Sequence, residues 1–141
     1  MEFINNDGGR AAAGFQGTTG DCVIRSIVIA LELPYQQVYD EMNGLIKSHR
    51  KTKIQKSSSS RGGVNKKFYR NFLESRGWKW IACMKIGTGC KVHLKAEELP
   101  KGRIIARVSK HLCAVIDGVI NDTHDCSRNE TRCVYGYFIK A

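Results

Sequence analysis

A cysteine stands at the end of the segment QGTTGDC, residues 16–22, in a place where it is able to react. Cys22 is followed at once by the apolar run of residues 23–33, which predicts a buried helix. A cysteine at the first turn of a helix has a lowered thiol pKa, because unpaired backbone N–H groups and the helix dipole stabilise the thiolate. The thiolate is the nucleophilic form, so the position of Cys22 indicates nucleophilic chemistry.

A nucleophilic cysteine needs a histidine that completes an ion pair and moves protons. The sequence offers four histidines, of which His49 lies in a basic loop and His93 in a turn-rich region. His111 opens the apolar run HLCAVI, where a sheet would fix its orientation. We therefore predict His111 as the base. His124 is an alternative base, because the expected strand register places it opposite His111.

A third group should orient the imidazole by accepting its other N–H. The signal Asp-Gly at residues 117–118 predicts a two-residue hairpin turn. In that register Asp122 shares a face with His111, at a diagonal Cα distance of roughly 7–8 Å. Asn121 points to the opposite face. The prediction is therefore Asp122, and a turn of another length would select Asn121 instead.

The segment before the cysteine supplies a hydrogen-bond donor. Acyl transfer places negative charge on the attacked carbonyl oxygen, and a donor aimed at this oxygen lowers the barrier by roughly 3 kcal/mol. The side-chain amide of Gln16 and the backbone N–H of Cys22 are the predicted donors. Each of these residues also has a structural interpretation that the sequence leaves open. Cys22 could be a small buried thiol and His111 a hydrogen-bonded strand histidine. Asp122 could cap the turn, and Gln16 could be a solvated loop residue.

Helices are expected to come first in the chain and strands second. Asp21 is a candidate N-cap for the first helix, and Pro34 suits the first turn of the second. Residues 1–15 are expected to be an irregular arm. The predicted helices are 21–33, 34–47 and 64–75, and the predicted strands are 78–84, 103–109, 111–116, 119–123 and 133–140. This order predicts an α+β domain in which the helices pack on an antiparallel sheet.

Length and composition set the broad class. A chain of 141 residues with 42% apolar content predicts one folded domain, 1–141, with a flexible basic loop at about 48–63. The polar start MEFINNDGGR does not resemble a signal peptide, and residues 23–33 are too short to span a bilayer. We therefore expect a cytoplasmic protein with reduced cysteines and no membrane partner. No C-x2-C pair occurs, so we expect no metal and no cofactor.

The net charge of +10 is concentrated in one segment. Between Glu41 and Glu74 there is no acidic residue, and without the bases of this segment the net charge is about +1. The nine bases are Lys47, Arg50, Lys51, Lys53, Lys56, Arg61, Lys66, Lys67 and Arg70. Such a patch is suited to an anionic substrate, nucleic acid or an acidic protein partner. A solvated loop is the alternative, since no aromatic residue interleaves the bases before Phe68.

The spacing Gln16-x4-Asp21-Cys22 resembles the Q-x4-D-C-G motif of the bacteriocin-processing peptidases that form the N-terminal domain of certain ABC exporters. More broadly it is similar to the papain-like cysteine peptidase superfamily. This resemblance implies a papain-like fold, a thiol protease and a catalytic triad, with Gln16, Cys22, His111 and Asp122 in the family's chain order. It covers residues 16–33 and 103–123. The stretch KHLCAVIDGVINDTHD also resembles small phage-encoded proteins. This resemblance implies that the protein is located in the cytoplasm of the host cell.

Two departures from the motif are visible, and three functions remain in competition. Val23 replaces the glycine that follows the nucleophile, and the 141 residues hold no transporter domain, so we expect no leader peptide as substrate. The first function is a peptidase or amidohydrolase that cleaves a peptide or isopeptide bond. The second is a transglutaminase or acyltransferase with the same triad. The third is an inactive papain-like protein that binds nucleic acid or an acidic partner through the basic segment.

Overall fold

The computed structural model describes residues 1–15, 20–48, 58–61, 63–85 and 87–141. Within these residues, three α-helices and a six-stranded mixed sheet form an α+β architecture. The helices are α1 (Cys22–Leu31), α2 (Tyr35–Lys47) and α4 (Lys66–Glu74), with a short 3-10 helix, η1, at Ala96–Glu98. The strands are β1 (Phe3–Asn5), β2 (Trp78–Ala82), β3 (Arg103–Val108), β4 (His111–Ile116), β5 (Val119–Asp122) and β6 (Gly136–Lys140).

The sheet has the strand order β1-β5-β4-β3-β6-β2. β1 runs parallel to β5, whereas the other neighbouring strands are antiparallel. The prediction of a purely antiparallel sheet is therefore wrong at this edge, and the arm 1–15, predicted to be irregular, contains a strand. The three residues of β1 are too few to show an alternating pattern. Their strand conformation comes from pairing with β5, for example Ile4 with Asn121.

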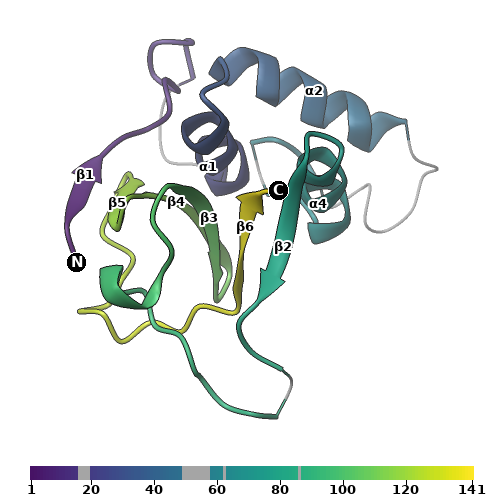
Figure 1. Cartoon of the computed structure of the whole chain (residues 1–141). Helices are drawn as coiled ribbons and strands as arrows, with labels where there is room; N and C mark the ends of the chain where they lie inside the picture. Colours follow the sequence, from purple (N-terminus) through teal and green to yellow (C-terminus); the bar gives the residue numbers. More distant parts are fainter. Residues whose placement is uncertain (16–19, 49–57, 62, 86) are drawn as a thin grey trace.

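The helices gather on one face of the sheet, as Figure 1 shows. Alternation along β4 separates two apolar cores. Leu112 and Ala114 pack in the core beneath the helices. Cys113 and Val115 pack in a second core on the other face. Connecting segments complete this second core with Leu94, Leu99, Cys126 and Val134.

The helices follow the predicted periodicity and differ from it at their ends. α1 buries eight of its ten residues and ends at Leu31, because Glu32 adopts a left-handed conformation with φ 57°. α2 buries Val38, Met42 and Ile46 at four-residue spacing. α4 begins two residues later than predicted. No helix in the described parts of the chain is long and apolar enough to cross a membrane.

The hairpin between β4 and β5 has the predicted two-residue turn. Asp117 and Gly118 both have positive φ, 48° and 77°, which is the conformation of a type I′ turn. Ile116 therefore pairs with Val119, and Ala114 pairs with Asn121. The register predicted from the sequence is confirmed.

The prediction that all six cysteines are reduced thiols is wrong for two of them. Cys90 and Cys133 form a disulfide across 43 positions of sequence, and the other four cysteines are free. The bond depends on two connecting segments that run side by side, since Leu94 donates to the carbonyl of Arg132 and Val134 donates to that of Val92. Spacing along the chain does not reveal that pairing.

Candidate active site

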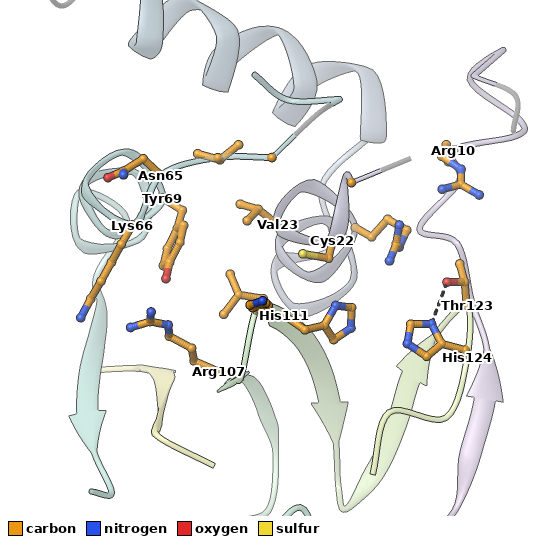
Figure 2. A pocket seen from close by; sticks show the side chains of 16 residues that line it. Arg10, Cys22, Val23, Asn65, Lys66, Tyr69, Arg107, His111, Thr123 and His124 are labelled. Atoms are coloured by element: carbon orange, nitrogen blue, oxygen red, sulfur yellow. Dashed lines mark hydrogen bonds between the residues drawn. The ribbon is translucent and has the colours of Figure 1, made fainter. Parts of the chain in front are cut away.

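Cys22 is the first residue of α1, and His111 is the first residue of β4. α1 lies across the start of β4, so the thiol and the imidazole meet where the two elements begin (Figure 2). Both side chains are partly accessible. The structure therefore brings together the two groups that the sequence predicts as nucleophile and base.

Asp122, the last residue of β5, accepts a hydrogen bond from the His111 ring. The His111 Nε2 to Asp122 Oδ2 distance is 2.6 Å, and the aspartate is 3% exposed. Asn121 takes no part in this contact, because its side chain bonds with Asn6 and with the carbonyl of Val119. Of the two alternative orienters that the sequence offered, the structure places Asp122 beside the imidazole.

The electrostatic surroundings of Cys22 favour its thiolate. Burial alone would raise the pKa of this thiol, but the hydrogen bond and the charge of His111 outweigh it, so the pKa lies below its ordinary value. The backbone N–H of Leu112 and the charge of Arg25 act in the same direction. A nucleophilic thiolate is therefore populated at lower pH than in a free cysteine.

The imidazole is held in its charged form. Burial would lower the pKa of His111, but hydrogen bonds to Asp122, Cys126 and Cys22 raise it to about 11. The pKa of Asp122 is lowered despite its burial, because the hydrogen bond and charge of His111 stabilise the carboxylate. The three groups thus form a chain of alternating charge: thiolate, imidazolium and carboxylate.

Arg25 is a component of this site that sequence reasoning missed. It lies on α1 with 5% of its surface exposed, and its Nη2 is 3.3 Å from Asp122 Oδ1. The backbone N–H of Thr123 donates to the same oxygen at 2.7 Å. An arginine inside an apolar helix run was the available signal, because a buried charge requires a partner.

Asp21 does not have the predicted role of helix cap. It occupies the N-cap position, but its side chain makes no capping hydrogen bond to the helix. Its fully buried carboxylate instead accepts from Arg25, from Arg10 Nη1 at 3.0 Å and from the Tyr35 hydroxyl at 2.6 Å. The start of α1 is thus fixed by an ion-pair network that includes a residue of α2.

A second thiol also contacts the imidazole, and sequence reasoning missed it too. Cys126 has a pKa lowered to about 6, chiefly because the Cys113 thiol donates to it, with further stabilisation from His111. Burial opposes this shift. Cys126 is only 2% exposed, whereas Cys22 is partly accessible.

His124, the substitute base of the sequence interpretation, lies next to His111. The two ring centroids are 5.3 Å apart, and His124 is exposed. The ligand atoms of His111, Asp122 and His124 lie within 4.8 Å of one another. These three side chains are the group in the described residues that is placed to hold a metal ion. Asp122 Oδ2 already bonds to His111, so a metal there would have to displace that hydrogen bond.

A cleft of about 860 Å³ opens over Cys22 and His111. Its basic lining residues are Arg10, Arg25, Lys66, Arg107 and Lys110, and the described residues contribute no carboxylate to the lining. In Figure 2, Lys66, Tyr69 and Arg107 lie on one side of Cys22 and Arg10, Thr123 and His124 lie on the other. The thiolate therefore stands in the middle of a positively charged cleft.

Some predicted site residues fall outside the described residues. These are Gln16, Arg50, Lys51, Lys53 and Lys56, together with most of the predicted basic loop. Of the described basic-segment residues, Lys66 lines the cleft. Lys47, Arg61, Lys67 and Arg70 are exposed, and Arg70 pairs with Glu74. Among the described bases of this segment, Lys66 is therefore the one that lines the cleft, and the predicted patch does not line it as a whole.

The chain matches no protein-family model, and its comparison with curated proteins and with solved structures likewise finds no match. Any assignment of chemistry consequently depends on the geometry of the residues themselves.

Proposed function

We propose that the protein is a papain-like cysteine hydrolase that cleaves a peptide or isopeptide bond. One observation carries the proposal. The Cys22 thiol, at the start of a helix, contacts an imidazole whose Nε2 lies 2.6 Å from a buried carboxylate, and both the cysteine and the histidine line a cleft. Helix start, strand histidine and following-strand acid also occur in the chain order that the papain-like resemblance implies.

In the first half of the reaction, the Cys22 thiolate attacks the amide carbonyl carbon and forms a carbon–sulfur bond. The carbonyl oxygen becomes an oxyanion, which the backbone N–H of Cys22 and the predicted donor Gln16 would stabilise. The carbon–nitrogen bond then breaks, and the His111 imidazolium gives its proton to the leaving amine. A thioester, a free amine and a neutral imidazole remain.

In the second half, water attacks the thioester while His111 accepts the proton of this water. The carbon–sulfur bond breaks, and the acid leaves with the Cys22 thiolate restored. The raised pKa of His111 in the enzyme before reaction does not prevent this step, because part of the rise comes from the charge of the Cys22 thiolate. That charge is absent in the thioester, so the pKa of His111 falls when it must act as a base.

Site-resolved alkylation tests the proposal. Iodoacetamide, with mass spectrometry of the free cysteines 22, 83, 113 and 126, should modify Cys22 fastest near pH 7. The substitution His111→Ala should slow this reaction about tenfold or more, because the thiolate loses its ion pair. His93→Ala is the matched control, since His93 bonds with Glu98 away from the cleft. Equal rates at all four thiols would contradict the proposal.

A second experiment separates hydrolysis from transfer to an amine acceptor, the transglutaminase or acyltransferase alternative. A peptide mixture is incubated with the protein, with and without added amine, and the product masses are compared. Hydrolysis adds water to the acyl fragment, whereas transfer adds the amine. The variant Cys22→Ala should give neither product.

A further inference from the structure

One end of the cleft gathers positive charge without a matching acid. Lys66, from the first turn of α4, and Arg107, from β3, both line the cleft. Within the described parts of the chain neither forms an ion pair. Burial and the neighbouring charge of Arg107 lower the pKa of Lys66, which reflects two cations held near each other. Two like charges that no acid neutralises favour a bound anion.

Aromatic rings hold these two cations in place without neutralising them. Lys66 Nζ lies 5.3 Å from the centroid of a Trp80 ring, and the Arg107 guanidinium lies 6.0 Å from the Tyr135 ring centroid. A ring face attracts a cation and leaves its N–H donors free for a ligand. The two head groups are thus oriented before anything binds.

Tyr69 adds a neutral donor on the same side of Cys22 as the two cations (Figure 2). Only 4% of the residue is exposed, and its ring packs edge-on against Phe138 at 5.9 Å. Its hydroxyl makes no hydrogen bond within the described residues. In Figure 2 this hydroxyl points into the cleft toward Arg107, on the side of Cys22 away from His124. Burial raises the pKa of Tyr69, and the charges of Arg107 and Cys22 act on it in opposite directions, so the hydroxyl stays protonated and able to donate at pH 7.

We infer that Lys66, Tyr69 and Arg107 form a carboxylate-binding subsite, so that the substrate carries an acidic group beside the carbonyl that Cys22 attacks. A guanidinium fork, an ammonium and a hydroxyl together match the acceptors of a carboxylate. The subsite offers nucleic acid little, because the Tyr69 ring is buried and base stacking needs an open aromatic face. This inference rests on the proposed function and adds a substrate class to it, an acidic peptide.

Paired alkylating probes test the subsite without knowledge of the natural substrate. N-bromoacetyl-glutamic acid α-amide and N-bromoacetyl-glutamine amide differ by one charge and have nearly the same shape. Saturation kinetics of Cys22 modification should show about tenfold tighter binding of the glutamate probe. Lys66→Gln and Arg107→Gln should each reduce this preference, and the double variant should abolish it. Lys79→Gln, an exposed lysine outside the cleft with the same charge change, should keep it.

Two further probes define the source and the class of the ligand. N-bromoacetyl-alanine carries a terminal carboxylate, and its preference over N-bromoacetyl-alaninamide, lost in the same variants, would support a C-terminal acid as the group recognised. A short single-stranded RNA or DNA that shields Cys22 from iodoacetamide, and loses this effect in Lys66→Gln, would instead assign the subsite to nucleic acid and overturn the inference.

The subsite and the proposed function fail in different ways. If iodoacetamide modifies Cys22 rapidly but the glutamate and glutamine probes bind equally well, the subsite is wrong and the nucleophile stands. If Cys22 is no faster than the other free thiols, the proposed function itself is wrong. Circular dichroism and thermal unfolding of each variant show that a lost preference does not come from a lost fold.

Discussion

Arg25 of α1 donates a hydrogen bond to Asp122 of β5, with 3.3 Å between Nη2 and Oδ1. The same guanidinium bonds to Asp21, so one side chain joins the residue before Cys22 to the acid beside the imidazole. All three groups are at most 5% exposed. The helix that carries Cys22 is therefore tied to the strand that orients His111 by a buried ionic network rather than by apolar packing alone.

Removal of the Arg25 charge should destabilise the fold and raise the pKa of Cys22. In Arg25→Met two buried carboxylates lose a partner, which costs about 3–5 kcal/mol of unfolding free energy in such networks. Urea unfolding measures this loss. Arg76→Met, which breaks a partly exposed pair with Glu41, should cost only about 0.2–1 kcal/mol. Arg25→Lys keeps the charge and should show an intermediate loss. An unchanged stability of Arg25→Met would refute the role of the network.

The rate of Cys22 alkylation should fall as pH decreases through the lowered pKa of this thiol. The thiolate reacts and the thiol does not, so the midpoint of the pH–rate profile reports that pKa directly. His111→Ala should move the midpoint upward, since the main group that stabilises the thiolate is gone. Iodoacetamide kinetics between pH 5 and about 10 measure both profiles. Identical midpoints in the two proteins would exclude an ion pair between Cys22 and His111.

The stabilising effect of His111 should depend on pH in a defined direction. Its pKa is raised in the folded protein from 6.5 to about 11. A raised pKa means that the folded state binds the proton more tightly, so the contribution is complete below pH 6.5 and is lost as pH rises toward about 11. The difference in unfolding free energy between the wild type and His111→Gln should therefore shrink across this interval. Urea titrations at several pH values measure it, and a difference that grows with pH has the wrong sign.

The contact between His111 and Asp122 could be predicted because local rules decide it. The Asp-Gly turn sets the register of the hairpin, and strand alternation then sets which side chains share a face. Cys22 was found in the same way, from its place before an apolar helix run. Each of these signals lies within one short stretch of the chain and needs no knowledge of the tertiary structure.

The rest of the site depends on contacts between distant segments. Arg25 bonds to Asp122 across 97 positions, and Cys126 reaches His111 from an irregular connection after β5. β1 and the disulfide Cys90–Cys133 have the same origin, since each forms only when another segment lies beside it. Asp21 was misassigned as a cap because the local rule ignores a buried arginine one helical turn further on.

Gly136 should not tolerate a side chain. A Cβ there would lie 2.4 Å from two ring atoms of Trp80 and 2.6 Å from the carbonyl oxygen of Ile81, and that oxygen belongs to a paired strand. We expect Gly136→Ala to cost about 1–3 kcal/mol of unfolding free energy, the usual range for overpacking. Gly44→Ala is the matched control. A Cβ at Gly44 in α2 meets nothing within 4 Å, and this change should stabilise by about 0.5–1 kcal/mol.

Cys126 should be poorly reactive in spite of its low pKa. Its thiolate is stabilised by Cys113 and His111, but its 2% exposure keeps reagents out, whereas Cys22 opens into the cleft. Iodoacetamide near pH 7 should therefore modify Cys126 much more slowly than Cys22 in the folded protein and at a comparable rate in urea. Cys126→Ala should preserve the reaction of Cys22 and remove one hydrogen-bond partner of His111. Faster modification of Cys126 than of Cys22 in the folded protein would show that Cys126, and not Cys22, is the reactive thiol.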